Sequence, residues 1–184
     1  MGDVVIALWF FVPVGFANMA PIVAANIPWL ARFRTPMDFG RTFRGRRILG
    51  DNKTWRGLFC GMAAATLALW LQQVTAGNSA WLADFPGSVA YEDLPTLLLG
   101  PLFALGALGG DAAKSFVKRQ MGAAAGKPWP FFDQIGEIVG GILVTLPFVV
   151  FGFGVYVWVI VVWVTLDLGI STLAYTAGWK ERPW

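Results

Sequence analysis

The sequence predicts an all-α, polytopic membrane protein with five transmembrane helices. Hydrophobic residues make up 57% of the chain, whereas soluble domains contain about 45–50%. Ten tryptophans agree with this class, because indole rings favour the membrane–water interface. Five apolar segments each have roughly the 20 residues that a spanning helix needs. We expect them at about 4–31, 57–76, 94–113, 135–152 and 155–177, in a single integral-membrane domain that covers 1–184.

The first segment, 4–31, has the character of a retained helix. No basic stretch precedes it, and it continues past the length of a signal-peptide core. It contains Asn18 and Asn26, with Pro21 and Pro28 close by. Prolines kink or locally break a spanning helix. The asparagines are expected either to hydrogen-bond a neighbouring helix or an unwound carbonyl, or to line a groove for lipid or substrate.

The basic residues predict the orientation. All fourteen Lys and Arg residues lie in 32–56, in 114–134 and in the tail after the fifth segment. With five spans these stretches fall on one side, and the positive-inside rule assigns that side to the cytoplasm. We therefore expect the N-terminus outside, the C-terminus in the cytoplasm, and a location in the cell membrane. The net charge of +3 is too small to indicate a nucleic-acid partner.

Small residues in the second and fourth helices predict close packing between helices. Gly57 and Gly61 are four residues apart, as are Gly136 and Gly140. Such pairs form small faces that let the backbones of membrane helices approach each other closely.

Missing residue types exclude several kinds of site. The chain has no histidine and a single cysteine, Cys60. This composition excludes Ser-His-Asp and Cys-His nucleophiles, HExxH zinc sites, intrachain disulfides and cysteine metal clusters. Any chemistry must therefore use carboxylates, Lys and Arg, hydroxyl groups and a bound metal.

The third helix ends in a mixed-charge motif, "GDAAKSFVKR", at 110–119. If the helix continues past the interface, the spacing i, i+3, i+4 and i+7 puts four polar residues on one face: Asp111, Lys114, Ser115 and Lys118. A carboxylate beside ammonium and hydroxyl groups suits a ligand that combines Mg²⁺ with phosphate. A basic flank is also expected at any cytoplasmic helix end, so a purely topological role stays open.

The segment before the fourth helix reads "GKPWPFFDQIGE". It places Lys127 in a Gly/Pro-rich loop, with Asp133 and Glu137 one helical turn apart. Asp111 and Asp133 would flank this basic loop and could bind a divalent metal together. Carboxylates at a helix N-terminus are also stabilised by the helix dipole alone. The acid of the fifth segment, Asp167, is expected at the interface or beside a cation.

The first loop contains a second mixed motif, "GDNKTWRG", at 50–57. It combines acid, amide, cation and hydroxyl groups in Asp51, Asn52, Lys53, Thr54 and Arg56. Upstream arginines, among them Arg44 and Arg46, form either a surface that attracts anionic headgroups or contacts to a lipid phosphate. A purely electrostatic patch needs neither a carboxylate nor a hydroxyl, so we expect 51–56 to bind a ligand.

Together these motifs resemble the CDP-archaeol synthases, small integral-membrane enzymes that are distantly related to CDP-diacylglycerol synthases. The resemblance rests on Asn18-x2-Pro21, "GDNKTWRG", "GDAAKSFVKR" followed by "PFFDQ", and the closing "GWKERPW". It covers nearly the whole chain and implies five spans. It also implies Mg²⁺-dependent transfer of CMP from CTP to an archaeol-phosphate-like or phosphatidate-like lipid, with release of pyrophosphate.

The resemblance implies a role for each matching residue. The catalytic centre would consist of two metal carboxylates and two lysines: Asp111, Asp133, Lys114 and Lys118. The phosphates of CTP would be held by residues from both motifs: Asp51, Asn52, Lys53, Thr54, Arg56, Ser115, Arg119 and Lys127. The lipid phosphate or its groove would be contacted by Arg44, Arg46, Asn18 and Asn26.

Two other classes of function stay open at this stage. A small transporter or channel would use intramembrane acids as an ion path, although the charged motifs here cluster on one membrane face. A non-catalytic membrane scaffold would need only a basic loop that binds lipid. The chain lacks the DG-x2-AR-x8-G-x3-D-x3-D motif of CDP-alcohol phosphotransferases, which disfavours that enzyme class.

Overall fold

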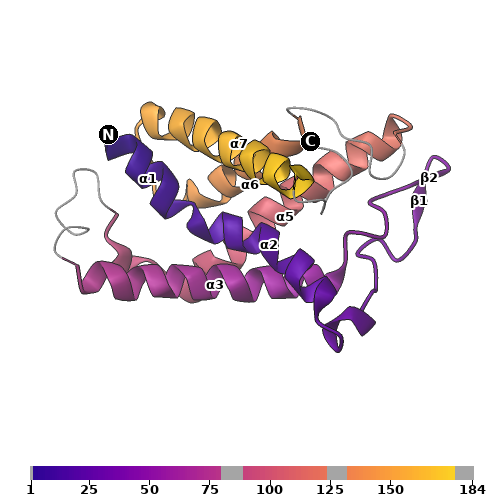
Figure 1. The fold of residues 1–184 in the computed structure, drawn as a ribbon, viewed down its shortest axis with the longest axis horizontal. Helices are drawn as coiled ribbons and strands as arrows, with labels where there is room; N and C mark the ends of the chain where they lie inside the picture. Colours follow the sequence, from indigo (N-terminus) through magenta and orange to yellow (C-terminus); the bar gives the residue numbers. More distant parts are fainter. Residues whose placement is uncertain (1, 80–88, 124–131, 177–184) are drawn as a thin grey trace.

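Helices account for most of the computed structural model, which describes residues 2–79, 89–123 and 132–176 (Figure 1). The elements, in chain order, are α1 (Gly2–Phe10), α2 (Val12–Asn26), η1 (Leu30–Arg32), β1 (Thr42–Phe43), β2 (Arg46–Arg47), α3 (Trp55–Gly77), η2 (Tyr91–Asp93), α5 (Thr96–Gln120), α6 (Phe132–Thr145) and α7 (Phe153–Thr176). The main helix pairs are α5 with α6, α2 with α3, α3 with α5, and α1 with α7.

Three helical stretches are long and apolar enough to cross a membrane: Gly2–Asn26, Trp55–Gly77 and Thr96–Gln120. Two shorter apolar helices follow, Ile135–Thr145 and Phe153–Gly169. A mainly helical membrane protein is therefore confirmed. The count of five spans and their orientation stay predictions.

The prediction of the first helix, 4–31, was wrong at the C-terminal end. The helix stops at Asn26, and Ile27 takes an extended conformation. Pro28 explains this end, because the ring of a proline disfavours the helical conformation of the residue before it.

Two other helix ends also differ from the sequence prediction. The fourth helix ends at Thr145, seven residues before the predicted end at 152, because Pro147 limits its continuation in the same way. The third helix runs on to Gln120, where 113 was predicted. Its charged C-terminal turns are thus helical, as the shared face of the 110–119 motif requires.

A break between α1 and α2 is repaired by a side chain from α3. Pro13 lies in the first turn of α2 and has no N–H to donate to the carbonyl of Trp9 four residues earlier. The side-chain amide of Gln72, which is buried, donates a hydrogen bond to that carbonyl instead. Such a substitute donor allows a membrane helix to contain a proline, because the freed carbonyl keeps a hydrogen bond.

The predicted small faces do form helix contacts. Gly57 lies against Pro21 of α2, and a Cβ atom at Gly61 would sit 3.2 Å from the carbonyl oxygen of Ala17. On the other side of the bundle, Gly136 and Gly140 of α6 face two further small residues of α5, Gly110 and Gly106. The α5 and α6 backbones therefore touch directly, which explains their close packing.

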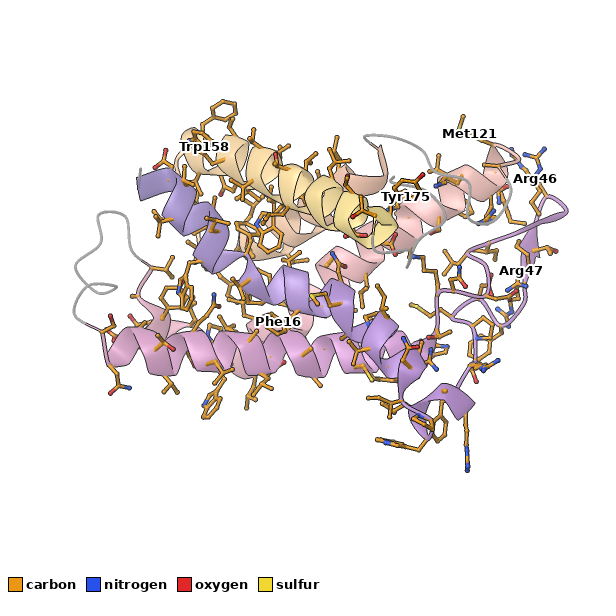
Figure 2. The ribbon with its side chains drawn as sticks, in the orientation of Figure 1. Phe16, Arg46, Arg47, Met121, Trp158 and Tyr175 are labelled. Carbon is orange, nitrogen blue, oxygen red and sulfur yellow. The ribbon has the colours of Figure 1, made fainter. Side chains whose placement is uncertain are left out.

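The apolar core fills the end of the bundle near the N-terminus. Phe10 and Phe103 are fully buried, with ring centroids 5.6 Å apart, and Phe151 packs edge-on against Phe10 at 4.9 Å. Large apolar side chains also cover the outside, such as Phe16 and Trp158 (Figure 2). An apolar exterior is expected where the solvent is lipid.

The opposite end of the bundle carries the loop 27–54 with a two-stranded hairpin (Figure 1). This hairpin is a small departure from the all-α prediction. Its turn residues Arg44 and Gly45 both have positive φ, 52° and 75°, as the tight turns of two-residue hairpins require. β2 contacts α5, and Figure 2 shows Arg46 and Arg47 on the hairpin at the same end as Met121.

Candidate functional site

A buried carboxylate, Asp38, organises the first loop. Its side chain is 1% exposed and accepts hydrogen bonds from the N–H groups of Gly40 (3.0 Å), Leu49 (2.9 Å) and Gly50 (3.1 Å). The Arg47 guanidinium adds an ion pair at 3.0 Å. Burial alone would raise the pKa of Asp38, but the bonds from Arg47, Leu49, Gly50 and Gly40 outweigh it and hold the pKa well below its usual range.

Asp38 and the cap of α3 together fix the "GDNKTWRG" motif. Thr54 is the N-cap of α3, and its hydroxyl accepts a hydrogen bond from the N–H of Gly57 at 3.2 Å. Upstream, the N–H of Met37 donates to the carbonyl of Lys53 at 2.7 Å. Lys53 is thereby presented at the start of α3, toward α5.

Asp111 of α5 is the centre of a compact charge cluster. Its carboxylate forms ion pairs with Lys53 from the first loop and with Lys114, whose Nζ lies 2.9 Å from Oδ1. The side chains are largely buried: 16% of Asp111, 23% of Lys53 and 13% of Lys114 are exposed. A largely buried carboxylate needs such partners, because removing a charge from water costs several kcal/mol.

Glu137 of α6 and Asn18 of α2 extend this cluster to two more helices. The side-chain amide of Asn18 donates a hydrogen bond to Glu137, and Nζ of Lys114 lies 3.8 Å from the same carboxylate. Residues 119 positions apart are thus linked. Polar contacts tie α2, α5 and α6 together around Asp111.

Four members of the cluster, Asn18, Lys53, Asp111 and Glu137, lie in the wall of a cavity of about 860 Å³, whereas Lys114 does not line it. Eight of the predicted site residues line it: Asn18, Asn26, Asp51, Asn52, Lys53, Thr54, Arg56 and Asp111. Glu137 and Arg34 also line it, and the apolar part of the wall includes Ile22 and Leu108. One cavity thus brings together α2, α5, α6 and the first loop, as a site for a charged ligand with an apolar portion requires.

The other predicted residues lie elsewhere or outside the described part. The Ser115 hydroxyl donates to the carbonyl of Asp111 at 2.9 Å within α5, and Arg119 donates to the carbonyl of Ala123 at 2.7 Å. Lys118 lies in the last turn of α5. Lys127 lies outside the described residues, as does the side chain of Asp133, whose backbone is in the first turn of α6.

Arg44 and Arg46 lie on the hairpin and do not line the cavity. The Arg44 guanidinium sits 5.3 Å from the centre of the Phe43 ring. Arg46 donates a hydrogen bond to the carbonyl of Gln120 at the end of α5. These contacts fasten the hairpin to α5, and the assignment of both arginines to a lipid phosphate stays a prediction.

The chain is similar over nearly its whole length to a known family. A model of the CarS-like family, described as CDP-archaeol synthase, matches residues 2–184. The chain belongs to the CDP-archaeol synthase family. Curated relatives with this name include those of Pyrococcus horikoshii (33% identical, over 100% of this chain and 99% of the relative) and Methanoregula boonei (38%, over 82% and 90%). The Halobacterium salinarum relative is 36% identical, over 100% and 98%.

A solved structure agrees with this family and with the fold. It is described as an intramembrane enzyme for archaeal membrane lipid biosynthesis and is 32% identical to this chain. The two superpose with a TM-score of 0.71, covering 90% of this chain and 91% of the other. The resemblance that the sequence motifs indicated, to the CDP-archaeol synthases, is therefore confirmed.

The motifs of this CDP-archaeol synthase family member did not identify three residues that shape the site. Asp38 lies in "PMDFG", where an acid followed by glycine two residues later signals a turn but not burial. The sequence marks Arg34 only as one of the basic residues of 32–56, and Glu137 only as an acid one helical turn after Asp133. The contacts of Asp38 with the loop backbone, and the positions of Arg34 and Glu137 in the cavity wall, depend on tertiary structure, so no local pattern reveals them.

Proposed function

We propose that this protein transfers CMP from CTP to a membrane lipid phosphate, which gives a CDP-lipid and pyrophosphate at the cytoplasmic face. The observation that supports this most directly is Asp111 between Lys53 and Lys114, in a cavity whose wall is partly apolar. The names of the curated relatives agree with the product class. An archaeol-phosphate-like lipid is the first substrate to test, and a phosphatidate-like lipid the second.

The reaction needs positioned phosphates more than it needs a covalent intermediate. An oxygen of the lipid phosphate forms a bond to the α-phosphorus of CTP while the bond from that phosphorus to the pyrophosphate oxygen breaks. Negative charge develops on the leaving pyrophosphate, so preorganised cations lower the barrier. We assign Lys53 and Lys114 to these phosphate oxygens, because substrate binding would offer each ammonium group an acceptor other than Asp111.

We propose Mg²⁺ as the metal ion of this reaction. In sites that act on phosphates this ion takes one or two carboxylates and completes its shell with substrate oxygens and water. Within the described residues, no three Asp, Glu, His or Cys side chains form a metal-holding group. We propose that Asp111 and Asp133 hold the ion with the triphosphate. When bound, it would neutralise phosphate charge and orient the triphosphate.

The experiment is to incubate purified protein with CTP labelled at the α-phosphate, Mg²⁺ and a panel of lipid phosphates. We expect label in the organic phase only with Mg²⁺ and one lipid class. Asp111→Asn should remove turnover, while the protein still inserts and purifies normally. Full turnover in this variant would refute the role of Asp111. No label and no CTP binding in the wild type would favour a transporter or a scaffold.

A further inference from the structure

The cavity has a second cationic region, formed by Arg34 and Arg56. Both residues line the cavity, and both are anchored to the turn that follows α2. Nε of Arg34 donates to the carbonyl of Ala31 at 3.0 Å, and Nη1 of Arg56 donates to the carbonyl of Leu30 at 3.2 Å. Adjacent carbonyls of one turn therefore hold two guanidinium groups beside the same cavity.

Neither arginine has an acidic partner among the described residues. The acids of the ion pairs described above, Asp38, Asp51, Asp111 and Glu137, pair with Arg47, Lys53 and Lys114. Nε of Arg56 is buried and has no acceptor in this part of the chain. A guanidinium group carries five donors, and a buried donor without an acceptor is costly. The two side chains thus retain donors and two positive charges for a ligand.

The arginine pair and the Asp111 cluster lie at opposite ends of the cavity wall that α2 provides. Asn18 is at the inner end, where it contacts Glu137. Asn26, the last residue of α2, is next to the turn that anchors the arginines. The two asparagines are eight positions apart, which corresponds to about 12 Å along a helix.

Between the two asparagines, the residues of α2 that line the cavity are apolar. Ile22 and Ala25 of α2 line it, and the Ile22 side chain is exposed, as are its neighbours Met19 and Val23. On a membrane helix such a face meets lipid chains. A ligand that places an anionic group between the arginines can therefore extend apolar chains along α2 into the bilayer.

We propose that Arg34 and Arg56 form the subsite for the phosphate monoester of the lipid substrate, with the apolar face of α2 directing its chains into the membrane. This inference rests on the proposed function. In-line attack requires the incoming phosphate and the leaving pyrophosphate on opposite sides of the α-phosphorus. Two cationic regions at opposite ends of one cavity meet this requirement. A monoester dianion is matched by two guanidinium groups, which bind phosphate oxygens bidentately.

The test separates the KM for the lipid phosphate from the KM for CTP. We expect Arg34→Gln and Arg56→Gln each to raise the lipid KM by about 10- to 100-fold, as expected for lost bonds to a charged group, while the CTP KM changes less than about twofold. Arg32→Gln is the matched control, because it removes one charge two residues from Arg34 at a side chain outside the cavity wall. A raised CTP KM with an unchanged lipid KM would assign the pair to the nucleotide and overturn the inference.

A binding measurement without turnover provides the second readout. The thermal stabilisation of purified protein by the lipid phosphate, with no CTP present, should be lost in Arg34→Gln. A phosphodiester lipid with the same chains should stabilise wild type and Arg34→Gln equally. If Arg34→Gln instead loses mainly the stabilisation by the diester, the two arginines form a general headgroup site and the inference is overturned. If no lipid is ever labelled but the monoester effect holds, the proposed function fails and the subsite stands. If label is transferred normally by both Gln variants, the subsite fails and the function stands.

Discussion

Replacing Asp38 by Asn should loosen the first loop without disturbing the helices. Each carboxylate oxygen of Asp38 accepts two principal bonds: Oδ1 from Gly40 and Arg47, and Oδ2 from Leu49 and Gly50. An amide nitrogen in place of either oxygen would face two donors. Two part-buried donors then lose their acceptor, at up to about 1–3 kcal/mol each. A local loss of about 3 kcal/mol raises the opening equilibrium of the loop about a hundredfold.

Hydrogen exchange measured by mass spectrometry is the assay, because it reports local opening segment by segment. We expect protection of the Leu49 and Gly50 amides to fall by about a hundredfold in Asp38→Asn, while α3 and α5 stay as protected as in the wild type. The CTP KM should rise as well, since the loosened stretch positions Lys53.

Asp51→Asn is the matched control for exchange. Asp51 is the other carboxylate that pairs with Arg47, at 2.8 Å, but its side chain is 80% exposed. An exposed pair of this kind contributes about 0–1 kcal/mol, so protection should change less than about fivefold. Unchanged protection in Asp38→Asn, or an equal loss in Asp51→Asn, would show that the buried carboxylate does not hold the loop.

Three further predictions follow from the same contacts. Acid should open the first loop only below about pH 4. The pKa of Asp38 is depressed in the folded protein, so its contribution to stability is present above the ordinary carboxyl pKa and is lost as pH falls through the folded value. Pepsin cleavage between 38 and 50 should therefore rise from pH 4 to pH 2 in the wild type but not in Asp38→Asn, which has no carboxyl group to titrate at this position. Lys53→Ala should raise the CTP KM by about 10- to 100-fold in steady-state assays, and an unchanged KM with a normal rate would remove the first loop from the nucleotide site. Gly140→Ala should destabilise the protein by about 1–3 kcal/mol in thermal unfolding, since the new methyl group meets the Gly106 carbonyl, whereas Gly109→Ala, with open space around it, should be neutral or stabilising; equal effects would contradict direct α5–α6 contact.

The sequence predicted the helices well because apolar runs are a local signal. Its errors were at helix ends, where Pro28 and Pro147 end the helices earlier than hydrophobicity alone suggests. The shared face of Asp111 and Lys114 was also predictable, since both lie on one helix at a fixed spacing. The structure confirms that pair at 2.9 Å.

Contacts between distant segments could not be predicted in this way. The bond from Asn18 to Glu137 joins two helices across most of the chain, and no periodicity encodes it. Likewise, the sequence marks Asp38 only as a loop acid, because its burial depends on backbone N–H groups that the folded loop turns inward. Arg34 becomes a site residue only because the turn after α2 aims it at the cavity.

The charge distribution along the cavity indicates where an anionic substrate first binds. At the inner end, the carboxylates of Asp111 and Glu137 balance the ammonium groups of Lys53 and Lys114, and short contacts join them. At the outer end, Arg34 and Arg56 have no such balance among the described residues. An anion therefore meets net positive charge beside Arg34 and Arg56, whereas the inner cluster must exchange partners before its lysines can bind phosphate. Because this exchange replaces one ion pair by another, the buried charges stay compensated throughout. Lys53 and Lys114 therefore leave the carboxylates only when a substrate phosphate is present to accept them.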